Sequence, residues 1–158
     1  MSIYSTTLSL NVKINLKTKL IAMLFKTSAL KVADYDRPFW YTSGKIGPYY
    51  INTHFLYGGE KKANDLLDII NKEKEFILEC PNILLQYIEK NYKEEPIYRE
   101  IINELRVMIH NSINIDDIDY ISGGDRRAWF FSLIMAKVFE KPHITIYKNQ
   151  KCVLTTHN

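Results

Sequence analysis

Hydrophobic residues alternate strictly with polar residues near the N-terminus, and this period-2 pattern predicts a half-buried strand over residues 7–17. The apolar members of that segment are Leu8, Leu10, Val12, Ile14 and Leu16. From Leu20 onward the apolar residues recur at helical spacing, so we predict a helix over residues 18–30. Aromatic and β-branched residues over 39–53 predict two short extended runs around a turn that contains Gly and Pro. We group these elements into an N-terminal cap over residues 20–55.

Apolar residues at helical spacing continue over residues 60–112, which we predict to be a mostly helical middle segment. Asn82 is the expected N-cap of one helix within it. Pro96 is expected at the first position of the next helix, where its missing N–H costs nothing.

The last third of the chain, residues 115–151, has the pattern of one strand–helix–strand unit. We expect a strand over 115–122, then a loop, a helix from Trp129 that is apolar nearly all round, and a strand over 143–147. Such a unit normally has parallel strands and a right-handed crossover. We therefore predict an α/β fold with three layers and a short parallel sheet.

Composition changes this picture little. The chain has 158 residues, 46% hydrophobic and 25% charged, which suits a single globular domain over residues 1–158. A net charge of +3 argues neither for nucleic acid nor for an anionic membrane surface. Residues 1–12 lack the features of a secretory signal, no apolar run is long enough to span a membrane, and Cys80 and Cys152 are unclustered. We expect a cytoplasmic protein.

One segment with candidate chemistry is the loop Gly123-Gly124-Asp125-Arg126-Arg127, which we call the anion loop. It lies between a predicted strand and the N-terminus of a helix, where free N–H groups and the helix dipole attract anions. Arginine adds forked donors that match phosphate oxygens. The same residues also fit a tight glycine turn with a capping Asp125 and solvated arginines, and the local sequence alone favours that reading.

Two further segments carry cations next to turns. Ser43, Gly44 and Lys45 precede a cluster of aromatics that includes Tyr49, and this surface could stack a planar ring. A hairpin with core aromatics also explains these residues, and the local sequence alone favours that interpretation. Lys148 and Lys151 follow the last predicted strand and could fold over a polyphosphate, or simply be solvated.

The histidines show no metal-ligand spacing, so we predict no protein metal site. They are His54, His110, His143 and His157.

In order and spacing, these three segments together resemble the orotate phosphoribosyltransferase family. The family's S-G-x-x-S-P-Y segment stands here as Ser43 to Tyr50, its Gly-containing loop as Gly123 to Ala128, and its Arg-Lys…Lys pattern as Tyr147 to Lys151. The sequence departs from that pattern, since Gly47 replaces the second Ser and Tyr147 replaces the Arg. The family's acidic strand and Thr-Thr-Gly-type ribose loop are missing from this chain.

The resemblance implies a phosphoribosyltransferase-like, Rossmann-like parallel sheet that is incomplete at its C-terminal end. It implies phosphoribosyl pyrophosphate with Mg²⁺ and a pyrimidine base as substrates, and a homodimer. By the same resemblance, Lys148 and Lys151 are catalytic, Ser43, Gly44, Lys45 and Tyr49 bind the base, and the anion loop binds phosphate.

Three hypotheses follow. The first is a divergent orotate-type phosphoribosyltransferase, with little or no activity expected from a chain that lacks the ribose loop. The second is a non-catalytic nucleotide- or phosphate-binding regulatory module. The third is an interaction protein that uses the helices of residues 82–110 as its partner surface.

Overall fold

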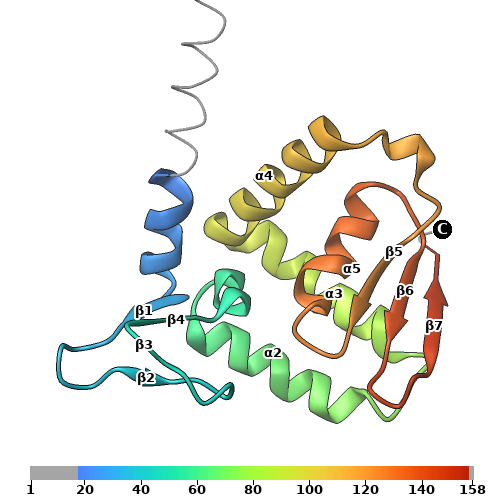
Figure 1. Ribbon diagram of the computed structural model, residues 1–158. Helices are drawn as coiled ribbons and strands as arrows, with labels where there is room; N and C mark the ends of the chain where they lie inside the picture. Colours follow the sequence, from blue (N-terminus) through green and yellow to red (C-terminus); the bar gives the residue numbers. More distant parts are fainter. Residues whose placement is uncertain (1–17, 157–158) are drawn as a thin grey trace, which may run out of the picture.

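The computed structural model describes residues 18–156, which form an N-terminal cap, a helical middle and a small C-terminal sheet (Figure 1). The strand predicted over 7–17 lies outside the described residues. Within the described residues, the predicted first helix covers residues 18–26 and ends earlier than predicted. It ends where Ser28 adopts a left-handed backbone conformation with φ +56°, and where the Thr27 hydroxyl donates to the Met23 carbonyl at 2.8 Å.

The cap consists of two short antiparallel pairs, and the extended structure predicted over residues 39–53 is present, whereas the strand over residues 30–32 was not predicted. Its strands are β1 (Leu30–Val32), β2 (Phe39–Trp40), β3 (Ile46–Gly47) and β4 (Tyr49–Ile51). β1 pairs with β4, and β2 pairs with β3. An ion pair of 3.0 Å between Lys31 and Glu60 connects the cap to the helical middle.

The helical middle confirms the prediction for residues 60–112. A 3-10 helix, η1 (Thr53–Tyr57), is followed by α2 (Glu60–Glu73), α3 (Cys80–Glu94) and α4 (Pro96–Ser112). Pro96 is the first residue of α4, as predicted. The prediction for Asn82 is wrong, because α3 already begins at Cys80 with Pro81 in its first turn and Asn82 lies inside the helix.

The C-terminal strand–helix–strand unit is confirmed. β5 (Ile121–Gly124), α5 (Trp129–Val138) and β6 (His143–Ile146) follow one another, and β5 and β6 are parallel, with Ile121 opposite His143. The first strand begins later than predicted, because residues 115–117 form a 3-10 turn, η2 (Ile115–Asp117). The Asn114 side chain caps that turn by accepting from the Asp116 N–H.

The predicted α/β fold with a short parallel sheet is present in part, in the parallel pair β5–β6, and the structure differs from the prediction in two respects. β7 (Cys152–Thr155) adds an antiparallel strand, so the sheet order is β5-β6-β7. Within residues 18–156, a tight turn and not a helix joins β6 to β7, and the helices with the most contacts to the sheet are α5 and α3. Leu154 of β7 is 63% exposed.

The core lies where α5 packs between the sheet and the helical middle (Figure 1). Trp129, Phe130 and Leu133 of α5 are fully buried, which confirms the prediction of a helix that is apolar nearly all round. Tyr98 of α4 is buried beside them and donates its hydroxyl to the Phe130 carbonyl. Among residues 18–156, no helix is both long and apolar enough to cross a membrane.

Candidate functional site

The parallel register of β5 and β6 determines where the candidate site lies. Gly124 is paired with Ile146, so the residues that follow each of them leave the sheet at the same carboxyl edge. The anion loop and the turn of residues 147–151 therefore lie side by side, at the lower end of the sheet in Figure 1. Open α/β sheets bind ligands at this edge.

The anion loop is fixed at its start by close packing against α5. Gly123 is buried, and a Cβ on it would lie 2.8 Å from the Cβ of Ser132. The Trp129 indole N–H donates to the Gly123 carbonyl at 2.9 Å. Around Gly124, by contrast, a Cβ would meet no atom within 4 Å. The anion loop thus begins with a closely packed residue, Gly123, and continues with Gly124, which has free space around it, before the N-terminus of α5.

The arginines of the anion loop differ in their partners. The Arg126 guanidinium donates to the side-chain oxygen of Asn71 in α2, and this contact ties the loop to the helical middle. Arg127 is exposed and forms no hydrogen bond or ion pair within residues 18–156. Arg127 is therefore the side chain of the pair that is available to an incoming anion. The sequence analysis did not distinguish the two arginines. It also did not identify Asn71, because nothing in the sequence of α2 indicates a contact with the anion loop.

Lys148 and Lys151 are both exposed at the same edge, but not in the loop that was predicted. They belong to a closed hairpin turn between β6 and β7, so β6 is not the last strand. The Tyr147 N–H donates to the Lys151 carbonyl at 2.9 Å, and the Gln150 N–H donates to the Tyr147 carbonyl at 3.0 Å. Such a turn presents its cations in a defined place and cannot fold over a ligand as a long loop would.

Tyr147 anchors that turn to the core. Its hydroxyl donates to the Ile77 carbonyl at 2.9 Å, and its ring packs edge-on against Trp129 with centroids 5.1 Å apart. Burial raises the pKa of the Tyr147 hydroxyl, so the hydroxyl stays protonated and keeps donating. The family pattern has an Arg at this position, and in this structure the position holds a buried packing residue.

His54 is the residue near the anion loop that sequence reasoning did not recognise. It lies in η1, is 3% exposed, and packs against the Phe55 ring at 4.6 Å and the Phe130 ring at 6.0 Å between centroids. Burial and then the charges of Arg127 and Arg126 lower its pKa to about 4. Only the packing of η1 against α5 brings it there, so no spacing in the sequence could have found it.

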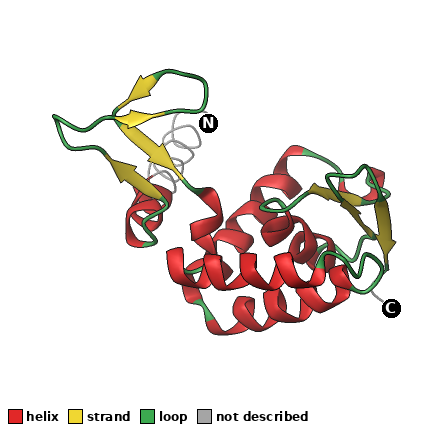
Figure 2. Cartoon of the chain, turned by 90° about the horizontal axis from the view of Figure 1, so that it is seen from below, coloured by secondary structure: helices red, strands yellow, loops and turns green. Residues whose placement is uncertain are grey.

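The residues predicted to face a base lie on the cap. Ser43, Gly44 and Lys45 form the turn between β2 and β3, where Gly44 has φ +76° and the Tyr41 N–H donates to the Lys45 carbonyl at 2.8 Å. Tyr49 is half-exposed in β4. Figure 2 shows the cap strands standing away from the sheet. In the described part of the chain, no hydrogen bond or ion pair joins the cap turn to the anion loop or to the Lys148 turn.

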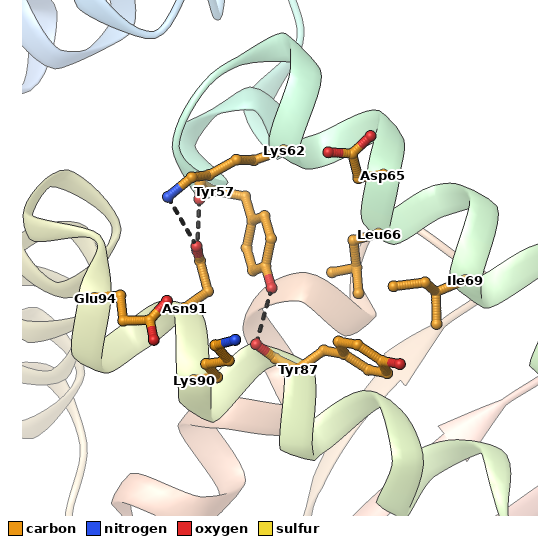
Figure 3. Close-up of a pocket in the computed structure, with 9 residues that line it drawn as sticks. All are labelled: Tyr57, Lys62, Asp65, Leu66, Ile69, Tyr87, Lys90, Asn91 and Glu94. Carbon is orange, nitrogen blue, oxygen red and sulfur yellow. Dashed lines mark hydrogen bonds between the residues drawn. The ribbon is translucent and has the colours of Figure 1, made fainter.

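A separate polar pocket of about 180 Å³ lies between α2 and α3 (Figure 3). Several of its lining residues connect neighbouring elements. The Asn91 amide donates to the Tyr57 carbonyl at 2.6 Å, Lys62 forms a 2.8 Å ion pair with Glu95, and the Tyr57 hydroxyl donates to the Tyr87 carbonyl. These contacts connect η1 and α2 to α3, whereas the side chains of Asp65, Lys90 and Glu94, which also line the pocket, form no hydrogen bond or ion pair within residues 18–156.

No family model and no curated protein matches this chain. Among solved structures it is similar to the orotate phosphoribosyltransferase of Francisella tularensis, with 17% sequence identity and a TM-score of 0.41. The match covers 87% of this chain and 50% of that chain, so this chain spans about half the length of the enzyme it matches.

Proposed function

We propose that this chain binds the diphosphate group of a phosphorylated sugar, of the phosphoribosyl pyrophosphate class, at the carboxyl edge of the β5–β6 sheet. The observation that supports this most is the pairing of Gly124 with Ile146, since it brings Arg127 and Lys148 to one edge. Backbone N–H groups at the start of α5, the helix dipole and three exposed cations would then be available to a ligand at this edge. No carboxylate of the described chain is ion-paired with Arg127, Lys148 or Lys151.

Each side chain has a distinct role in this proposal. Arg127 offers two parallel donors to phosphate oxygens, whereas Lys148 and Lys151 act as point charges. If phosphoribosyl transfer occurs, these cations would stabilise the departing diphosphate, where negative charge develops. Arg126 would position the loop through Asn71.

Mg²⁺ is part of the proposal by way of the ligand. Within residues 18–156, no group of three or more His, Cys, Asp or Glu side chains could hold a metal ion. Mg²⁺ is commonly held by one or two carboxylates together with phosphate oxygens and water. Asp125 fits the single-carboxylate part of such a set, and the ion would supply charge neutralisation of the diphosphate when bound.

The pyrimidine base belongs to the finer part of the proposal. Ser43, Gly44, Lys45 and Tyr49 would contact it, but these residues lie on the cap, away from the carboxyl edge (Figure 2). Transfer therefore requires the cap of this chain to approach the edge, or the cap of a second copy in a homodimer to reach it. Binding without transfer requires neither.

Titration calorimetry with phosphoribosyl pyrophosphate and Mg²⁺ tests the site. We expect Arg127→Ala to weaken binding about tenfold to a hundredfold, because it removes charged hydrogen bonds. Lys148→Ala should weaken binding about twofold to fivefold, as for an exposed charge pair. Lys141→Ala is the matched control, since Lys141 lies just before β6, at the opposite edge of the sheet. Equal affinity of Arg127→Ala and wild type would contradict the proposal.

A second candidate function, a regulatory module that binds phosphate without turnover, is favoured by the separation of the cap from the edge. An assay for loss of orotate in the presence of phosphoribosyl pyrophosphate distinguishes the two. Turnover that Lys45→Ala reduces, with affinity for phosphoribosyl pyrophosphate unchanged, supports the transferase. Binding with no turnover supports the module.

A further inference from the structure

His54 is a buried side chain whose ring nitrogens have no hydrogen-bond partner within residues 18–156. Its ring packs between Phe55 of its own 3-10 helix and Phe130 in the first turn of α5. Buried polar groups nearly always have a partner, because leaving one unpaired costs free energy. An unpaired imidazole next to the anion loop therefore requires an explanation.

The charges around His54 come from three elements. Arg126 and Arg127 of the anion loop oppose protonation of the ring, and Glu60 at the start of α2 favours it. Lys31 of β1 forms a 3.0 Å ion pair with Glu60, and its amine lies 5.6 Å from the centre of the Phe55 ring, which weakens the effect of Glu60. The first turn of α5 adds the positive end of a helix dipole. In the free protein burial of the ring, and then the charges of Arg127 and Arg126, keep His54 neutral.

We propose that His54 takes up one proton from solvent when an anion binds to the anion loop. A bound dianion would neutralise Arg126 and Arg127 in the field that His54 experiences, and would itself favour an imidazolium nearby. This inference rests on the proposed function, because it needs an anion in the loop. It adds a proton-coupled residue to the site, which makes the site prefer dianionic ligands and bind them more tightly at lower pH.

The direction of the pH dependence follows from linkage. The pKa of His54 is about 4 in the free protein. If ligand binding raises that value, the complex holds more protons than the free protein between the two values. Affinity then increases as the pH falls through this window, and is insensitive to His54 above it. His54→Gln removes the titration while keeping a polar side chain.

Nuclear magnetic resonance of the histidine rings tests the proposal directly. The probe is inorganic sulfate, because it stays dianionic over the whole range and adds no titration of its own. Chloride at matched ionic strength is the control for screening. We expect saturating sulfate to raise the midpoint of His54 by about one pH unit or more. At constant pH, the ring resonances of His110, which is exposed on α4, should not respond to sulfate.

Calorimetry at about pH 5 in two buffers of different ionisation enthalpy gives a second readout, proton uptake per sulfate bound. We expect uptake by wild type and almost none by His54→Gln. The wild-type resonances, assigned through the backbone, decide the question even if His54→Gln does not fold. Sulfate binding that depends on Arg127 but leaves the His54 midpoint unmoved overturns this inference alone. Failure of sulfate and diphosphate alike to bind overturns the proposed function, and this inference with it.

Discussion

At Gly123, β5 lies close against Ser132 of α5. A Cβ at this position would lie 2.8 Å from the Cβ of Ser132 and nearer still to its hydroxyl oxygen. That hydroxyl is hydrogen-bonded to Nε2 of fully buried His143 at 2.9 Å, and Nδ1 of the same ring pairs with the Thr145 hydroxyl. The contact between strand and helix is therefore coupled to a buried polar network on β6.

We predict that Gly123→Ala lowers the free energy of unfolding by about 1–3 kcal/mol, because α5 must shift or the Ser132 hydrogen bond must break. The neighbouring Gly124→Ala is the matched control, since its added Cβ meets no atom within 4 Å. Urea denaturation of both variants measures the difference. Equal destabilisation by the two substitutions would contradict this account of the contact.

The β6–β7 hairpin sets the position of the cations at the carboxyl edge, and its turn contains one strained residue. Gln150 has φ +66°, a conformation that favours glycine. We predict that Gln150→Gly raises the free energy of unfolding by up to about 1 kcal/mol, whereas Gln150→Ala keeps the strain and is near neutral. Thermal denaturation compares the two. If Gln150→Ala stabilised the protein as much as Gln150→Gly, the destabilisation would come from the glutamine side chain and not from the backbone conformation.

The elements that sequence patterns predicted correctly are those whose pattern reflects burial. α5 is apolar nearly all round because it is enclosed, and Pro96 starts α4 because a first-turn residue needs no N–H partner. β7 was missed because it is short and half-exposed, so neither alternation nor an apolar run marks it. In the site, the anion loop and the lysines were found from residue type. Asn71 and His54 were not, since only packing between distant segments brings them to the loop.

Three parts of the molecule meet at η1. The cap enters it from β4, the helical middle leaves it at α2, and its side chains pack against the start of α5 (Figure 1). The Lys31–Glu60 ion pair crosses the same junction. Because His54 is buried at this meeting point, its charge state affects the stability of the whole fold as well as the anion loop. Placing a neutral histidine there makes folding itself sensitive to acid.

The stability of the protein should therefore fall as the pH is lowered through the window set by His54. In the unfolded chain His54 binds a proton below its ordinary pKa of 6.5, whereas in the folded protein it does so only below about 4. The unfolded state binds more protons between these values, so acid favours it. From about pH 7 to about pH 5 we expect a loss of about 2 kcal/mol. Urea denaturation at both pH values should show that loss in wild type and a much smaller one in His54→Gln, because the carboxylates titrate alike in the two proteins. Equal losses in both would mean that His54 is reached by solvent in the folded state and that η1 does not close over it.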